Sequence, residues 1–521
     1  MHLSKVPFSK TNAFSDFFLD YIRGDEGLRN LYNRFPHPDA FGEQITEKQK
    51  SFPAASRDIL VDELMNQYHD IPLKQAAMSN IERLRQANSF TVVTGHQLNI
   101  CTGPLYFVYK IVTVINACRR LKQQYPDINF VPVYWMASED HDYDEIKYLR
   151  LFGKKYTWVT RQQGAVGRFS PDGLAQLTAS LPGDASIFTN AYREGKTLSE
   201  SVRLYVNELF GDEGLVVIDA DVPNLKRQFI PVMEEDMLHH TTRKLVDETN
   251  AVLESSGYKA QVHCRDVNFF YLDGHLRSRI ERHDKSFNVL DTTISFNEST
   301  LTETIADAPE KFSPNVILRP LYQEMILPNL AYTGGPAEVV YWLQLKRVFD
   351  HFNVPFPILL PRNFAMIVES QVKRKLDKTG LTINDLFDSK NEIFKKWVVA
   401  HSVNDLSIDN ESKSLHSLFE ALRKKAEAID ITLGPHVAAT GKRAFNRIEG
   451  IGKKMLRAEK RIQQNKLDQI ESVKDLLFPN GGLQERTDNL LNFYPADPQF
   501  IQSLLANLDP FDFQFNVLTY E

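Results

Sequence analysis

Five carboxylates and one imidazole crowd into residues 136–145, whose sequence is Met-Ala-Ser-Glu-Asp-His-Asp-Tyr-Asp-Glu. They directly follow the apolar run 130–135, which is rich in valine and aromatic residues and typical of a buried strand. In an open parallel α/β sheet, ligands bind in the crevice beyond the carboxyl ends of the strands. Because neighbouring carboxylates repel one another unless a partner neutralises them, the cluster predicts a site for a substrate, a metal ion or an amine.

The acidic cluster allows three interpretations. Asp140, His141 and Asp142 could hold a divalent ion through oxygen and imidazole donors. They could instead bind the ammonium group of an amine substrate and accept its proton. The third interpretation is an acidic cap at the start of a helix with a solvated outer face. The position behind a strand favours a functional role, so these three are the candidate catalytic residues, and a metal requirement stays open.

A second group of polar residues follows the β-branched run 89–94, before a helix expected over 104–124 with Pro104 at its first position. A glycine-bearing loop that opens a helix offers free N–H groups and a positive dipole end to an anion. The loop matches neither the dinucleotide-binding nor the P-loop fingerprint. A polar turn that closes the junction is the alternative. The candidate binding residues are Thr94, Gly95, His96, Gln97, Thr102 and Gly103.

A similar loop is expected over 331–338, where Thr333-Gly334-Gly335-Pro336 leads into a helix expected over 337–352. We therefore expect two helix N-termini to meet at one crevice, which would suit a ligand with several acidic groups, such as a nucleotide plus a dicarboxylate. Arginine guanidinium groups nearby suit carboxylate or phosphate, although surface salt bridges are the alternative. Glu338 either complements the helix dipole or binds an amine. The further candidate binding residues are Arg319, Gln323, Gly334, Gly335, Glu338, Arg362 and Asn363.

Four expected strands, 89–94, 130–135, 215–219 and 356–360, alternate with helices. This alternation predicts an α/β fold with a doubly wound, parallel, Rossmann-like sheet. The long gaps between strands must be structured insertions, and 268–280 carries a hairpin signature around Asp273-Gly274. The predicted domains are an N-terminal helical segment (1–88), the core (89–221 and 331–363, with an insertion at about 148–195), an inserted region (222–330), a helical domain (364–480) and a C-terminal segment returning to the core (481–521).

The helical domain carries two apolar repeats with steps of three and four residues. Two such helices, joined at Gly434-Pro435, predict an antiparallel coiled-coil arm. The simplest interpretation is that this arm only packs against the rest of the protein or forms a dimer. The repeats consist of Leu415, Leu418, Leu422, Ala426 and Ile429, and then Ile448, Ile451, Met455, Ala458 and Ile462.

Composition narrows the function classes. The 521 residues are 42% hydrophobic and 25% charged with a net charge of −6, so no basic footprint for nucleic acid is expected. No apolar run approaches the roughly 20 residues that cross a bilayer, and the first residues lack the apolar core of a signal peptide. Three cysteines make no disulfide framework. We expect a cytoplasmic protein without a membrane or nucleic-acid partner.

In combination, these blocks resemble the BshC family, the cysteine-adding enzymes of bacillithiol biosynthesis, nearly end to end. The resemblance implies a Rossmann-like core with connecting-peptide insertions and an α-helical coiled coil that forms a homodimer. It also implies a ligase that joins L-cysteine to glucosaminyl-malate. The blocks are Thr94-Gly95-His96-Gln97, Thr102-Gly103-Pro104-Leu105-Tyr106, 135–145, Arg319-Pro320 with Gln323, 334–338, Pro361-Arg362 and Leu508-Asp509-Pro510.

Amide formation from a carboxylate is uphill in water, so we expect ATP to activate cysteine as an acyl-adenylate or acyl-phosphate before the glucosamine amine attacks. Arg319, Arg362 and the two Thr-Gly loops would bind the malate carboxylates, and a carboxylate or His141 would take the amine proton. Related adenylating ligases carry His-x-Gly-His and Lys-Met-Ser-Lys-Ser loops. Here the first loop reads Thr94-Gly95-His96-Gln97 and the second has no counterpart. The alternatives are a nucleotidyltransferase-like transferase, a metal-assisted hydrolase, or a non-catalytic scaffold of the thiol pathway.

Overall fold

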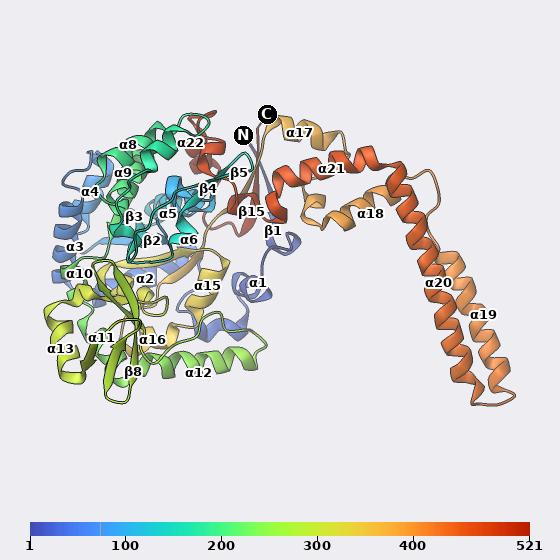
Figure 1. Ribbon diagram of the computed structural model, residues 1–521, viewed down its shortest axis with the longest axis horizontal. Helices are drawn as coiled ribbons and strands as arrows, with labels where there is room; N and C mark the ends of the chain where they lie inside the picture. The colour runs from blue at the N-terminus through green and yellow to red at the C-terminus, as the bar shows by residue number, and fades with distance from the viewer. Residues whose placement is uncertain (73, 521) are drawn as a thin grey trace. The chain divides into compact units, whose positions relative to one another are not determined.

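The computed structural model describes residues 1–72 and 74–520 (Figure 1). The chain divides into two compact units. The larger consists of Met1–Ser9, Ala13–Met366 and Gly482–Leu518, and the smaller is formed mainly by Ile367–Gly481. None of the helices in the described ranges combines the length and the apolarity that a bilayer crossing requires.

A five-stranded sheet in the order β13-β12-β2-β3-β6 forms the centre of the larger unit, and every neighbouring pair in it is parallel. Its side chains are almost all buried, as expected for a parallel sheet covered on both faces. This confirms the predicted doubly wound, Rossmann-like α/β fold. The strands are β2 (Ser89–His96), β3 (Asn129–Met136), β6 (Val216–Asp219), β12 (Asn329–Gly334) and β13 (Ile358–Pro361).

The strand register brings the carboxyl ends of the strands to one edge. His96 pairs with Met136, and Met136 pairs with Asp219. On the other side of β2, Thr94 pairs with Thr333. The segments that follow β2, β3 and β12 therefore emerge side by side.

Four predicted boundaries near this edge are wrong. Residues 331–334 belong to the interior strand β12 rather than to a loop. The prediction missed this strand because a short run containing Asn, Thr and Gly carries little strand signal. Strand β2 continues through His96. The following helix starts at Tyr106 rather than at Pro104, which forms an isolated bridge with Asn489 instead. The predicted helix 337–352 is divided into α15 (Pro336–Leu343) and α16 (Lys346–His351).

Helices cover the sheet. Helix α5 packs on β2 and β3, α2 packs on β12, and α3 and α9 pack on β6. The helices of this layer are α1 (Asp16–Arg23), α2 (Phe41–Ser51), α3 (Ala54–Gln67), α4 (Gln75–Arg83), α5 (Tyr106–Gln124), α9 (Leu198–Phe210), α14 (Arg319–Ile326) and α22 (Phe500–Asn507). An additional sheet has the order β1-β15-β14, with β1 (His2–Pro7), β14 (Phe364–Val368) and β15 (Gln514–Thr519).

Two insertions extend from the core. The first comprises α6 (Tyr143–Ile146), β4 (Tyr148–Leu151), β5 (Lys154–Thr157), α7 (Leu174–Ala179) and α8 (Ser186–Glu194). The second comprises α10 (Pro223–Arg227), α11 (Ile230–His239), α12 (Thr241–Ser255), α13 (Glu298–Asp307), and a sheet made of β7 (Phe269–Asp273), β8 (Leu276–His283), β9 (Ser286–Val289), β10 (Ser295–Asn297) and β11 (Phe312–Pro314). Strands β7 and β8 are antiparallel, with Asp273 paired to Leu276 next to the turn and Phe270 paired to Arg279 farther from it. This pairing confirms the predicted hairpin.

The smaller unit is helical, and α19 and α20 form the predicted antiparallel hairpin (Figure 1). The turn between them lies at residues 428–432, whereas Gly434-Pro435 falls in the first turn of α20, where proline is tolerated because its missing N–H would have no helical partner. Leu418, Leu422 and Ile451 are exposed on this hairpin. The helices are α17 (Ser370–Asp377), α18 (Lys390–His401), α19 (Asp409–Glu427), α20 (Leu433–Ile462) and α21 (Gln464–Leu477).

Candidate active site

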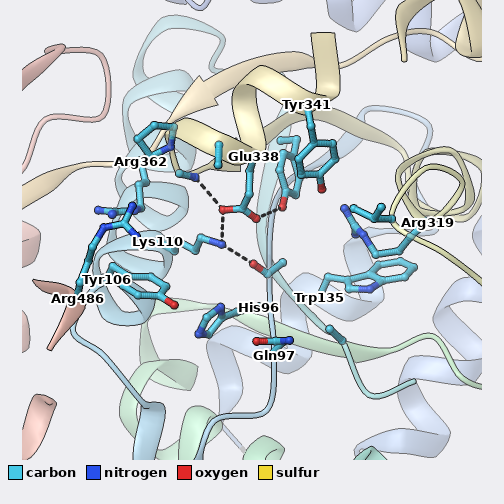
Figure 2. A pocket seen from close by; sticks show the side chains of 17 residues that line it. His96, Gln97, Tyr106, Lys110, Trp135, Arg319, Glu338, Tyr341, Arg362 and Arg486 are labelled. Carbon is cyan, nitrogen blue, oxygen red and sulfur yellow. Dashed lines mark hydrogen bonds and ion pairs between the residues drawn. The ribbon is translucent and has the colours of Figure 1, made fainter. Parts of the chain in front are cut away.

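A cavity of about 390 Å³ opens where β2, β3 and β12 end and α15 begins (Figure 2). Both Thr-Gly segments contribute to its wall, together with cationic and aromatic side chains from α5, α14 and the C-terminal segment. We call it the first cavity. Its labelled side chains are His96, Gln97, Tyr106, Lys110, Trp135, Arg319, Glu338, Tyr341, Arg362 and Arg486.

An ion pair between Lys110 and Glu338 forms the centre of the first cavity. Lys110 Nζ lies 2.6 Å from Glu338 Oε2 and donates to the Gly95 carbonyl oxygen at 2.8 Å. Glu338 also accepts hydrogen bonds from Tyr332 Oη at 2.7 Å and from the Gly335 N–H at 2.8 Å. Burial alone would raise the pKa of Glu338, but the Lys110 charge and these hydrogen bonds lower it to about 2. Glu338 is therefore ionised and caps the helix that it opens.

Groups of the chain itself lie at the starts of both helices. At α15, the Glu338 carboxylate accepts from the Gly335 N–H. Just before α5, the Leu105 N–H donates to the Asp488 carbonyl oxygen at 2.8 Å. The Asn489 amide fixes the preceding loop by donating to the carbonyls of Cys101 and Gly103 at 2.7 and 2.6 Å. The structure therefore differs from the expectation of two open helix termini, because a carboxylate already lies at the start of α15 and the N–H group just before α5 is paired.

Arg319 is a cation of the first cavity without an ion-pair partner among the described residues. Its Nη1 donates to Gln323 Oε1 at 3.0 Å, whereas its buried Nη2 has no hydrogen-bond partner among the described residues. The guanidinium lies 5.8 Å from the centre of the Trp135 ring and 5.6 Å from that of Tyr332. Such ring faces stabilise a cation that lacks a carboxylate. Arg319 is therefore positioned to receive an anionic group.

Arg362 differs from Arg319 because Glu485 already neutralises it. Their side chains form a buried bidentate pair with N–O distances of 3.1 and 2.5 Å. Only Nε of Arg362 is buried without a partner among the described residues, and it lies near Gly335. Arg486, an exposed residue on the same segment as Glu485, adds a further positive charge to the wall of the cavity.

His96 supplies a neutral imidazole. Its Nε2 is buried without a hydrogen-bond partner in the described part of the chain, and its ring contacts those of Tyr106 and Phe107. Burial lowers the pKa of His96 to about 3, and the charges of Lys110 and Arg362 act in the same direction. The imidazole is therefore uncharged at neutral pH.

The acidic cluster lies beside the Thr-Gly segment of β2, as the sequence predicted. Asp140 Oδ2 accepts a hydrogen bond from Gln97 Nε2 at 2.8 Å, and Oδ1 accepts one from the His141 N–H at 2.7 Å. Burial opposes ionisation, but the hydrogen bonds from His141 and Gln97 lower the pKa of Asp140 well below its usual range. The imidazole of His141 is exposed, and its Nδ1 lies 2.5 Å from Arg277 Nη1. Asp142 is also exposed.

A second cavity of about 390 Å³ lies on the far side of Arg319. It shares Trp135, Ala137, Val316 and Arg319 with the first cavity, and the cluster 139–141 lines it. Glu139 is paired with Lys226 at 2.5 Å, although burial still raises the pKa of Glu139. Within the described ranges, no three His, Cys, Asp or Glu side chains are grouped to hold a metal ion. The cluster therefore shows no preassembled set of three ligands in these ranges, and whether a metal takes part stays open.

Several predicted residues support the site rather than line the first cavity. Thr94 Oγ1 donates to the Thr333 carbonyl at 2.8 Å, and the Asn363 amide donates to the Asp509 carbonyl at 2.7 Å. Gln323 orients Arg319. Thr102 and Gly103 are left-handed, with φ of 68° and 62°, and Gly103 lines a third cavity of about 330 Å³.

Glycine is required at position 334, because a Cβ atom there would lie 2.9 Å from Glu338 Cβ.

Sequence reasoning missed several residues of the site. The signal for Lys110 is a single cation in an otherwise apolar stretch of α5. The missed residues are Lys110, Arg277, Tyr332, Tyr341, Glu485 and Arg486.

Comparison with known proteins agrees with this architecture. Residues 1–363 match the family description "Bacillithiol biosynthesis BshC, N-terminal Rossmann-like domain", and residues 365–520 match "Bacillithiol biosynthesis BshC, C-terminal coiled-coil domain". A relative from Cytophaga hutchinsonii, named "Putative cysteine ligase BshC", is 38% identical, with 100% of this chain and 99% of the relative covered. Relatives of the same name from Christiangramia forsetii and Flavobacterium johnsoniae are each 39% identical, covering 99% of this chain and 98% and 99% of their own lengths. The chain therefore belongs to the BshC family of bacillithiol biosynthesis.

Proposed function

We propose that this protein is a ligase that joins the carboxyl group of L-cysteine to the amine of glucosaminyl-malate, with ATP as the activating substrate. The observation that carries this proposal is the first cavity, where the partnerless Nη2 of Arg319 and the neutral imidazole of His96 line the same space in the described part of the chain. A cation without a carboxylate suits an acidic substrate. A neutral imidazole suits an amine that must lose a proton.

The reaction has two steps. The cysteine carboxylate attacks ATP and forms an acyl-adenylate with release of pyrophosphate, or an acyl-phosphate with release of ADP. The glucosamine nitrogen then attacks the activated carbonyl carbon, loses a proton, and expels AMP or phosphate. This sequence makes an otherwise uphill amide bond at the expense of one phosphoanhydride bond.

The residues of the first cavity have separate roles in this scheme. Arg319 and the exposed Arg486 bind the malate carboxylates, and the carboxylates offset the positive field around His96. Burial is the largest cause of the low pKa of His96, and the charges of Lys110 and Arg362 lower it further; bound carboxylates would oppose the effect of these charges and make the imidazole a better proton acceptor. Asp140, held by Gln97, orients His141 on the neighbouring cavity.

The apolar side chains exposed on α19 and α20 support a homodimer formed through the coiled-coil arm. Leu418 and Leu422 are one helical turn apart on α19, and Ile451 lies on α20. A second copy of the same hairpin would cover these side chains.

The test is product formation by the purified protein. Glucosaminyl-malate, L-cysteine and MgATP should give a product whose mass is the sum of the two substrates minus one water, detected by mass spectrometry. Arg319→Gln should raise KM for glucosaminyl-malate by about tenfold or more, since a charged hydrogen bond contributes about 1.5–3 kcal/mol. Arg161→Gln, an exposed control, should behave as wild type. Absence of product from folded wild-type protein would refute the proposal.

A further inference from the structure

The second cavity lies between the core and the second insertion. Its floor is the end of β3 and the segment 137–141, and its cover is the sheet of β7, β8 and β11 with the segment that leads into β7. Val267 and Phe269 supply apolar wall, and Arg265, Arg277 and Arg279 supply positive charge. The cavity therefore combines an apolar surface with three guanidinium groups.

The carboxylates of the second cavity act on Arg277, which lies within the electrostatic reach of Asp140 and Glu139, but they form no ion pair with Arg265 or Arg279 in the described ranges. Glu139 is paired with Lys226, and Asp140 accepts from Gln97 and from the backbone. In the ranges 1–72 and 74–520, the guanidinium groups of Arg265 and Arg279 have neither a hydrogen-bond nor an ion-pair partner. The cavity thus keeps an excess of positive charge that an anionic ligand would neutralise.

Contacts within the chain hold Arg277 in place. Its guanidinium lies 3.9 Å from the centre of the Phe270 ring, and its Nη2 donates to Ser313 Oγ at 3.3 Å. Its Nη1 lies 2.5 Å from His141 Nδ1. Its Nε is buried without a partner among the described residues. A fixed guanidinium loses little side-chain entropy on binding, which favours tight recognition of an anion.

Arg319 connects the two cavities, because it lines both. Glu338 already places a carboxylate at the start of α15, and the Leu105 N–H just before α5 donates to the Asp488 carbonyl oxygen, so neither position favours a phosphate. One guanidinium group can donate two parallel hydrogen bonds to the oxygens of a phosphate, and several guanidinium groups side by side can bind consecutive phosphates. The chemistry of the second cavity is therefore that of a polyphosphate site next to a carboxylate site.

We propose that the second cavity binds the polyphosphate chain of a nucleoside triphosphate, with Arg277 as the fixed anchor and Arg265 and Arg279 closing on the outer phosphates; this assignment rests on the proposed ligase function. The phosphorus atom that the cysteine carboxylate attacks then lies near Arg319, at the opening between the cavities. The acceptor amine approaches from the first cavity.

The experiment is isothermal titration of the purified full-length protein with MgATP, tripolyphosphate and L-malate. Arg265→Gln with Arg279→Gln, both at exposed positions, should weaken MgATP and tripolyphosphate binding by at least about tenfold and leave L-malate binding unchanged. The matched control is Lys259→Gln with Lys285→Gln, which removes the same charge from exposed positions of the same insertion outside the cavity. Arg277→Lys, which keeps the charge but loses the fork, should weaken both phosphate ligands without unfolding the hairpin.

Each outcome decides the assignment. Equal MgATP affinity in the Arg265/Arg279 variant and the control would overturn it, and so would the absence of saturable MgATP binding to wild type with L-cysteine present. Weaker MgATP but unchanged tripolyphosphate binding would also overturn it, because the cavity would then recognise the nucleoside. Product formation with unaltered nucleotide KM in the variant would refute this inference and leave the ligase function standing. Nucleotide binding that the Arg265/Arg279 variant weakens, without any product from wild type, would support this inference and refute the ligase function.

Discussion

Glu338→Gln tests whether the ion pair at the centre of the first cavity stabilises the fold. The pKa of Glu338 falls from an ordinary 4.5 to about 2 in the folded protein. A shift of that size, at about 1.36 kcal/mol per unit, corresponds to about 3 kcal/mol of stability. The carboxylate side chain is 27% exposed, so solvent screening reduces this stabilisation only slightly. The substitution would also leave Lys110 as a buried cation with the Gly95 carbonyl as its remaining partner among the described residues.

The assay is urea unfolding of wild type and Glu338→Gln, followed by tryptophan fluorescence. Trp342 is a suitable reporter because its ring stacks on Tyr332, whose hydroxyl donates to Glu338. Since the folded pKa is the lower one, the stabilisation is fully present above about pH 4.5 and is lost as pH falls toward 2. The difference between the proteins should stay near 3 kcal/mol from pH 7 to 5 and shrink below pH 4.5.

A double variant provides the control. Lys110→Met with Glu338→Gln removes both charges, and replacing a buried pair by neutral groups costs less than leaving one charge alone. The double variant should therefore be more stable than Glu338→Gln. A loss below about 1 kcal/mol for Glu338→Gln at pH 7, or a double variant at least as unstable as the single one, would refute the account of this pair.

Three further predictions concern catalysis and assembly. His96→Asn should lower kcat by about two orders of magnitude with little change in KM for glucosaminyl-malate, measured by steady-state kinetics; an unchanged kcat would exclude His96 as the proton acceptor. Asp140→Asn should lower activity by about tenfold or more, because the anchor for Gln97 and His141 is weakened, whereas the exposed Asp142→Asn should be neutral; equal effects of the two would contradict the geometry. Leu418→Lys with Ile451→Lys should give monomers in sedimentation velocity, and a dimer mass would rule out the arm as the interface.

The fold was predictable where residues carry strong local signals. Strand β3 is a run of aromatic and β-branched residues behind a proline-bearing turn, and the acids that follow it are placed by chain direction alone. Strand β12 was missed because its sequence, Asn-Leu-Ala-Tyr-Thr-Gly, is short and reads as a turn. Its place inside the sheet is set by tertiary pairing with β2 and β13, which local sequence does not encode.

The site was predictable to the extent that strand ends define it. Gln97 and Asp140 meet because β2 and β3 are neighbours in register. Arg277, which lies on a hairpin inside an insertion, contacts His141 although the two residues are 136 positions apart in the sequence. No local sequence pattern predicts such a contact. Lys110 was overlooked for a related reason, since a helical periodicity cannot distinguish a buried lysine with a partner from a solvated one.

The distribution of charge around the first cavity explains how the fold tolerates several buried cations. A buried charge without a partner costs several kcal/mol, so a fold can tolerate few of them. Lys110 and Arg362 are neutralised by Glu338 and Glu485 within the chain itself. Arg319 carries no such partner in the described part of the chain, and the aromatic rings around it offset part of the cost. An acidic substrate that pairs with Arg319 would replace the missing carboxylate, and the binding free energy would be concentrated at the boundary between the two cavities, where the acyl transfer must take place.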